Sequence, residues 1–160
     1  MRKMILAAAM AVFGAGGVVR ADIVINEIMY NSIETPDVEY IELYNDGATA
    51  VDVTNWYLLD SDPLHDHCPL VGVIQPGGYL VAAGFLSTFQ AKYPGVSNLN
   101  ANQFDSAVLG RGFSLGNSGD SVRIFDAFGV VQDFTAYDDL APWPTAANGT
   151  GPSLELVFPG

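Results

Sequence analysis

The chain has 160 residues, with 18 acidic and six basic side chains and a formal net charge of −12. Proteins that bind nucleic acids or anionic membrane surfaces use clusters of lysine and arginine, and this sequence is too poor in both for either class. Its single cysteine, Cys68, cannot form an internal disulfide. A chain of this size buries roughly two-thirds of its unfolded surface, so we expect one domain that folds without covalent cross-links.

The first 21 residues have the pattern of a secretory signal peptide. Positions 1–3 are Met-Arg-Lys, residues 5–19 carry no charge, and Ala21 ends a small-residue cleavage site. The apolar stretch is shorter than the ~20 residues of a membrane-spanning helix, although an uncleaved anchor is the alternative. We expect a secreted protein whose mature domain is residues 22–160, with no membrane span. Cleavage leaves three basic against 18 acidic residues, a net charge of −15.

Runs of β-branched and aromatic residues dominate the remaining sequence and predict strands. We expect strands at residues 23–28, 39–44, 51–59, 78–82, 121–125, 130–135 and 154–158. Between them, glycine, proline and asparagine mark turns at residues 35–37, 45–47, 75–78, 117–120 and 128–129. Short strands about ten residues apart are typical of an antiparallel sandwich or barrel.

One segment departs from the strand pattern. The apolar spacing of residues 86–93 suits one or two helical turns, which Pro94 and Gly95 would end. Within the 51–59 run, Trp56 stands among apolar neighbours, so we expect it in the core rather than at a ligand. The sequence therefore predicts an all-β antiparallel sandwich with one short helix.

Six segments, in order, are similar to those of a known family. They are residues 24–31 (VINEIMYN), 39–45 (EYIELYN), 51–58 (VDVTNWYL), 74–81 (IQPGGYLV), 113–122 (FSLGNSGDSV) and 151–155 (GPSLE). Together they resemble the lamin-tail domain, as found in bacterial exported proteins, over nearly all of residues 22–158. The resemblance implies an immunoglobulin-like β-sandwich without a catalytic centre. Such domains often accompany nuclease, phosphatase or spore-coat-like modules, or anchor larger exported proteins.

Residues 60–68 (DSDPLHDHC) contain three carboxylates, both histidines and the only thiol of the chain. Imidazole, carboxylate and thiolate together suit Zn²⁺ or a similar metal ion. The candidate ligands are Asp60, Asp62, His65, Asp66 and His67. The alternative is a polar surface loop that leads into a strand, with Cys68 turned to the core.

The spacing favours the surface loop over a metal site. Structural zinc sites need four ligands, commonly from two separated pairs, and no other histidine or cysteine is present. An EF-hand register also fails, because Leu64 takes the place of an oxygen ligand and His65 that of the turn glycine. We expect no cofactor and no tight transition-metal site. Weak Ca²⁺ binding, at about 10⁻⁴–10⁻³ M, is compatible with the carboxylates.

Two strand carboxylates, Glu27 and Glu42, raise the question of catalysis. They could act as an acid and a base, but a hydrogen-bonded structural pair is the interpretation we favour. The sequence therefore predicts a non-catalytic binding or structural module for a protein or cell-surface component. The alternatives are a metal-dependent module that binds Ca²⁺ or Zn²⁺ with the 60–68 loop, a hydrolase-associated accessory domain, and a hydrolase of unfamiliar design.

Overall fold

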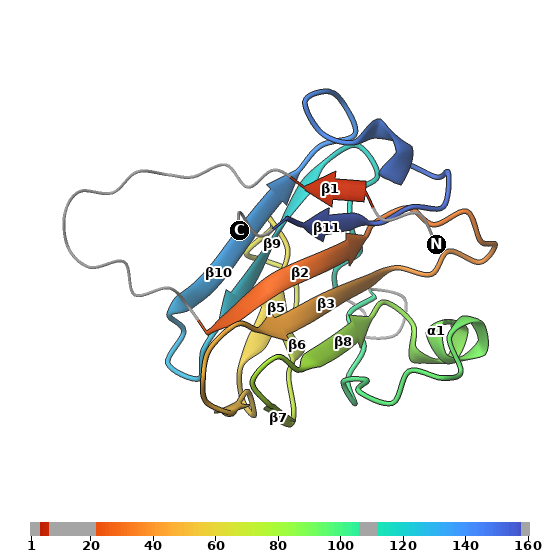
Figure 1. Cartoon of the computed structure of the whole chain (residues 1–160). Helices are drawn as coiled ribbons and strands as arrows, with labels where there is room; N and C mark the ends of the chain where they lie inside the picture. Colours follow the sequence, from red (N-terminus) through yellow and green to blue (C-terminus); the bar gives the residue numbers. More distant parts are fainter. Residues whose placement is uncertain (1–3, 7–21, 106–111, 158–160) are drawn as a thin grey trace, which may run out of the picture.

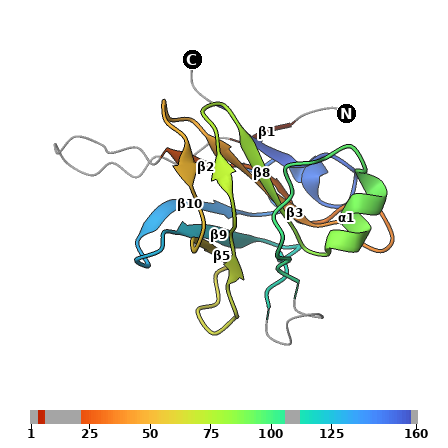
Figure 2. The same ribbon diagram turned by 90° about the horizontal axis from the view of Figure 1, so that it is seen from below.

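Two layers of mostly antiparallel strands form the molecule, as a computed structural model of the chain shows (Figures 1 and 2). The structure describes residues 4–6, 22–105 and 112–157. The first sheet has the order β1-β11-β2-β3-β8 and the second β10-β9-β5-β6. The first consists of β1 (Met4–Leu6), β11 (Leu154–Leu156), β2 (Ile23–Met29), β3 (Tyr40–Asn45) and β8 (Tyr79–Ala83). The second consists of β10 (Val131–Tyr137), β9 (Asp120–Phe125), β5 (Tyr57–Leu59) and β6 (Cys68–Pro69).

Three short elements complete the fold. Two of them, β4 (Val51–Asp52) and β7 (Val73–Ile74), pair with each other, and η1 (Thr145–Ala147) is a single 3-10 turn. Among the described residues, no helix is long and apolar enough to cross a membrane. This architecture confirms the predicted all-β antiparallel sandwich.

The core lies between the two sheets because side chains alternate along each strand. In β3, Ile41 and Leu43 point inward and are fully buried, while Glu42 lies on the outer face. In β9, Val122 and Ile124 face them from the second sheet. Complete burial of one such side chain contributes roughly 1.5–3 kcal/mol, so this inner layer sets the register of the strands.

The long strand predicted at residues 51–59 is wrong. Asn55 adopts a left-handed backbone conformation with φ of 71°, and the N–H of Trp56 donates to the Val53 carbonyl at 2.9 Å. This turn divides the run into β4 and β5, which belong to different sheets. Trp56 therefore comes just before β5 and packs half-buried against the edge of the core, not within it.

Another turn follows its sequence closely. In residues 75–78, the Gly78 N–H donates to the Gln75 carbonyl at 2.8 Å, and Gly77 has a φ of 69°. Proline followed by glycine suits a type II turn, because proline is favoured at the first central position and the second needs a positive φ. This turn leads directly into β8.

The predicted helix forms α1 (Leu86–Lys92), and it packs on the outer face of the first sheet. Its one buried residue, Phe89, contacts a small second apolar cluster that includes Val81 and Ala83 of β8. Tyr93 closes the helix by donating its N–H to the Phe89 carbonyl. The helix thus forms a wall beside β3 on this face of the sheet (Figure 2).

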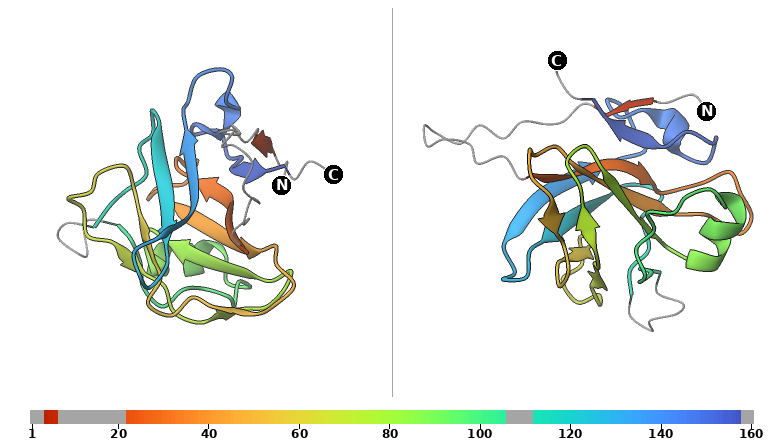
Figure 3. Two further views of the ribbon diagram at one scale, coloured as in Figure 1. Left: turned by 90° about the vertical axis from the view of Figure 1, so that its left-hand side faces the viewer. Right: turned by 60° about the horizontal axis from the view of Figure 1, so that its bottom comes forward.

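Strand β1 lies within the predicted signal peptide, at the edge of the first sheet (Figure 3). It pairs in parallel with β11, Met4 opposite Leu154 and Leu6 opposite Leu156. Residues 1–21 are thus not entirely outside the fold of the full chain. Cleavage after Ala21 remains a prediction, and it would leave β11 paired with β2.

Candidate functional site: an acidic and aromatic groove

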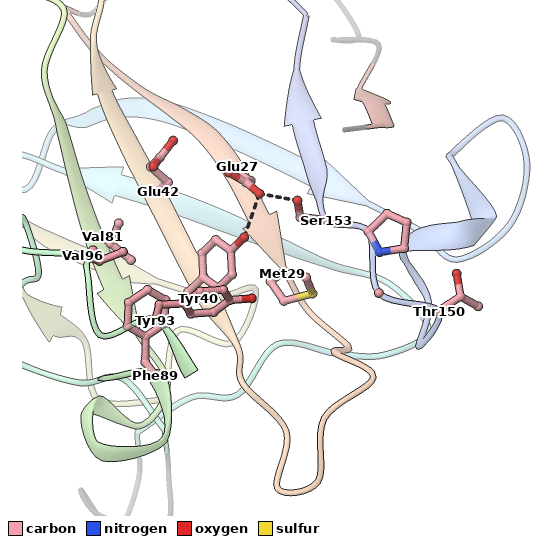
Figure 4. A pocket seen from close by; sticks show the side chains of 12 residues that line it. Glu27, Met29, Tyr40, Glu42, Val81, Phe89, Tyr93, Val96, Thr150 and Ser153 are labelled. Carbon is pink, nitrogen blue, oxygen red and sulfur yellow. Dashed lines mark hydrogen bonds between the residues drawn. The ribbon is translucent and has the colours of Figure 1, made fainter. Parts of the chain in front are cut away.

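A groove of about 670 Å³ opens on the outer face of the first sheet (Figure 4). Its floor comes from β2, β3 and β8, and its two walls come from the region of α1 and from the segment before β11. The lining residues are Glu27, Met29, Tyr40, Glu42, Val81, Phe89, Tyr93, Val96, Thr150, Gly151, Pro152 and Ser153. Most of this surface is apolar with a few polar groups, as in typical ligand sites, which are about 300–1,000 Å³ in size.

A β-bulge places two carboxylates side by side on the floor of the groove. Ile25 pairs with Leu43, but the next pair is Glu27 with Glu42, so Asn26 is the extra residue. Glu27 and Glu42 are therefore direct cross-strand neighbours on one face. Like charges directly opposite each other repel in a sheet, and hydrogen bonds to both side chains hold this pair in place.

Hydrogen bonds fix the orientation of both carboxylates. The Tyr40 hydroxyl donates to Oε1 of Glu27 at 2.7 Å, and the Ser153 hydroxyl donates to the same oxygen (Figure 4). The side-chain amide of Asn26 donates to Oε1 of Glu42 at 2.8 Å. These hydrogen bonds hold both carboxylates in position on the floor of the groove.

Aromatic rings form the wall on the α1 side of the groove. The Tyr40 ring meets Phe89 at 5.5 Å and Tyr93 at 6.0 Å between ring centroids, both edge to face. Phe89 and Tyr93 are 4.9 Å apart. Burial, reinforced by the nearby Glu27, raises the pKa of Tyr40, so its hydroxyl keeps the proton that it donates. The ring contacts hold these three side chains in fixed positions in the free protein.

The predicted metal-binding loop has a different geometry. Buried Asp60 accepts a hydrogen bond from Nδ1 of His65 at 2.7 Å and another from the Asp62 N–H at 3.1 Å. Oδ1 of Asp62 accepts the N–H of Leu64, and its Oδ2 lies 3.9 Å from Nε2 of His65. The structure therefore brings Asp60, Asp62 and His65 together, and their polar atoms bind one another and the backbone of the same loop.

The remaining residues of the loop point elsewhere. The ring of His67 lies against Tyr57 at 4.6 Å, and Asp66 lines a separate shallow depression beside it. Cys68 is fully buried near the Asn100 amide, and burial raises the pKa of its thiol to about 12. Across residues 22–105 and 112–157, no group of three or more histidine, cysteine or acidic side chains has the geometry to hold a metal ion.

The comparison with known families adds to this geometry. The model of the Lamin Tail Domain family matches residues 19–139. The chain belongs to the lamin tail domain family. That family consists of non-catalytic immunoglobulin-like domains that take part in protein interactions. No curated protein matches the chain. The match includes both groove carboxylates but ends at residue 139. The groove is therefore lined by the matched segment together with residues 150–153, which precede β11.

Sequence reasoning singled out Glu27 and Glu42 but missed the aromatic wall. Alternation along β3 could have placed Tyr40 on the same face as Glu42, because the two residues are two positions apart. The contribution of Ser153 had no such signal, since it comes from a segment 126 residues away from Glu27.

Proposed function

We propose that this lamin tail domain is an exported, non-catalytic binding module that docks a protein or cell-surface component. The observation that carries the proposal is the groove over the first sheet, with its fixed carboxylates and preformed aromatic wall. A preformed site avoids part of the entropy loss on binding, because its side chains are already ordered. The protein-interaction role of the family supports the same conclusion.

Export follows from the first 21 residues. A basic start, an uncharged apolar stretch and a small-residue site are the pattern that a signal peptidase recognises. N-terminal sequencing of protein recovered outside the cell should begin at Asp22. Recovery of the chain from the cytoplasm with Met1 intact would contradict export.

Site-specific cross-linking tests the docking role of the groove. A photo-reactive benzoylphenylalanine in place of Tyr93 should cross-link a discrete component of the producing cell's envelope. The control places the same group at Leu64, which is 78% exposed on the 60–68 loop. Equal cross-linking from both positions would contradict a groove-specific partner. A hydrolase screen on the same purified protein should find no activity.

A further inference from the structure

We infer, on the basis of the proposed export and cleavage, that the mature domain binds a partner polypeptide by strand addition at the edge of β11. In the full chain β1 occupies this edge and pairs in parallel with β11 (Figure 3). Met4 lies opposite Leu154, and Leu6 lies opposite Leu156. Cleavage after Ala21 removes β1, so this side of β11 loses its strand partner. The partner therefore supplies an extended segment that takes the place of β1.

The opposite edge of the first sheet differs, because the chain itself covers β8. Val81 forms a parallel bridge with Leu99, which follows α1 in the chain. The Val81 N–H donates to the Asn98 carbonyl at 2.9 Å, and the Asn100 N–H donates to the Val81 carbonyl at 2.7 Å. Among the described residues after the cleavage site, β2 is the one strand that pairs with β11. An uncovered strand is a template for another chain, so β11 is the edge that a partner can extend.

The sandwich keeps its core when β1 is removed. The described members of the main core cluster all lie between Ile23 and Leu154. Strand β11 stays attached to the sheet through its antiparallel pairing with β2, in which Leu154 lies opposite Ile28. Cleavage therefore opens the edge of a domain whose two sheets still pack on each other.

The residues of β11 specify which segment fits. Leu154 is fully buried, and Leu156 lies two positions further along the same face of the strand. Glu155 points to the opposite face, where Glu27 is its cross-strand neighbour. In the register of β1, the two partner residues opposite the leucines therefore need apolar side chains, whereas the residue between them can be polar. The segment that occupies the edge in the full chain, Met-Ile-Leu, is apolar throughout.

Charge favours a segment with basic flanking residues. The mature domain has three basic and 18 acidic side chains, a net charge of −15. In the sequence, Arg2 and Lys3 precede β1. Complementary charge accelerates encounter and suppresses pairing between molecules of like charge. The partner is therefore a different protein with a basic and apolar extended segment, not a second copy of this acidic domain.

The edge of β11 adjoins the wall of the groove. In a parallel arrangement, the partner residues that precede the paired segment lie next to residues 150–153, which line the groove. Ser153 directly precedes β11, and its hydroxyl donates to Glu27 on the groove floor. Strand addition thus names the backbone contact by which a docked polypeptide would be held beside the groove.

An NMR titration with a peptide of the sequence of residues 1–8, blocked at both ends, tests this inference. The ¹⁵N-labelled mature protein, which begins at Asp22, should show saturable shifts of the amides of residues 154–156. The full chain should bind the peptide at least about tenfold more weakly, because its own β1 competes at a high effective concentration. Equal binding by the two forms would overturn the inference.

N-methylated peptides distinguish strand addition from side-chain docking. Successive N–H groups of a strand point to opposite sides, so only one of two neighbouring residues donates its N–H to β11. A methyl group on the nitrogen of peptide residue 5 or of residue 6 should therefore weaken binding about tenfold in one case and less than about twofold in the other. Equal affinities of the two methylated peptides would contradict strand addition.

Nitroxide labels on the peptide determine the direction of the added strand. In the register of β1, a label at peptide position 1 lies near Gly151, and a label at position 8 lies just beyond Val157. The N-terminal label should broaden the amide signal of Gly151 more than that of Val157, and the C-terminal label should do the reverse. The opposite pattern would show antiparallel addition and overturn the register taken from β1.

The outcomes separate this inference from the proposed function. A protein that begins at Asp22 and is cross-linked through position 93, but shows no peptide-dependent shifts at residues 154–156, would overturn strand addition alone. Recovery of the chain with Met1 intact would overturn export and the open edge together. A mature protein that sediments as a dimer, which the peptide dissociates, would assign the edge to a second copy and overturn the separate partner.

Discussion

The groove and the 60–68 loop both gather carboxylates, but they use them differently. In the loop, Asp60 accepts hydrogen bonds from His65 and from the backbone of Asp62. The polar groups of the loop therefore bind one another. In the groove, Glu27 and Glu42 stand side by side on the floor, where Tyr40 and Asn26 donate hydrogen bonds to them. The loop carboxylates thus bind groups of their own loop, whereas the groove carboxylates line a cavity of the size of a typical ligand site.

This difference shows how similar residue types serve different purposes. The loop residues are adjacent in sequence, and short-range turns can satisfy them locally, as Asp62 does for the Leu64 N–H. The groove residues come from separate strands, from α1 and from the segment before β11. The folded sandwich therefore positions the groove, and the groove exists only in the complete domain.

Glu39 offers the largest expected effect, because it is a partly buried carboxyl without the histidine that Asp60 has beside it. It accepts the Leu115 N–H at 3.0 Å, and burial raises its pKa to about 8. A carboxyl that holds its proton in the fold contributes stability that is complete below pH 4.5 and is lost as the pH rises through 8. We expect the unfolding free energy to fall across this window by at most about 5 kcal/mol.

The control for this pH effect is Glu39→Gln. A neutral amide cannot titrate, so urea unfolding of the variant should lose much less stability between pH 4.5 and 8. If the unfolding free energy depended on pH in the same way in the variant and the parent, Glu39 would not hold its proton in the folded protein.

Phe89→Ala should disrupt the groove wall. Phe89 is 3% exposed and anchors α1 to the outer face of the first sheet, so its removal should cost about 3 kcal/mol. Leu64→Ala in the loop is the matched control, because Leu64 is exposed and should change stability by less than about 0.5 kcal/mol. Denaturant unfolding measures both, and a cost below about 1 kcal/mol for Phe89→Ala would mean that the wall is not packed.

Trp56→Ala should have a smaller effect than the loss of a core aromatic. Trp56 is half-buried at the core edge, so we expect a cost of about 1–2 kcal/mol, less than the 3–5 kcal/mol of a fully buried ring. Denaturant unfolding compares this cost with that of Phe113→Ala, because the ring of Phe113 is fully buried. Equal costs would place Trp56 within the core.

His65→Ala tests whether the loop stabilises itself. The hydrogen bond to Asp60 raises the pKa of His65, so the charged pair stabilises the fold below about pH 6.5 and is lost as the pH rises above the folded value. The His65 side chain is 38% exposed, and screening by solvent reduces the effect to about 1 kcal/mol at pH 6. The unfolding free energy lost in His65→Ala should be smaller at pH 8.5 than at pH 6. A loss that does not change with pH would contradict the ion pair between His65 and Asp60.

Much of the fold could be predicted from local sequence, but the site could be predicted only in part. Period-two alternation predicted β3 and β9, and proline with glycine predicted the turn at residues 75–78. The left-handed Asn55 was missed because valine, threonine and aromatic residues surround it, although asparagine is itself depleted in strands and tolerates a positive φ. The groove depends on a bulge at Asn26 and on a contact from Ser153, and long-range packing determines both.

The smallest expected effect concerns metal ions at the loop. Calorimetric titration of Zn²⁺ into metal-free protein should show no binding in the micromolar range, and His65→Ala with His67→Ala should change nothing. Ca²⁺ should bind at most weakly, at about 10⁻⁴–10⁻³ M. Micromolar Zn²⁺ binding that both substitutions abolish would move the functional site from the groove to the loop.

Chemical-shift mapping tests the central claim most directly, because it compares the two regions in one experiment. The ¹⁵N-labelled protein is titrated with the component that cross-linking at position 93 captures, and every assigned amide is followed. We predict saturable shifts at Glu27, Glu42 and Ser153, with the amides of residues 60–68 unchanged. Shifts concentrated at residues 60–68, with the groove unaffected, would contradict it.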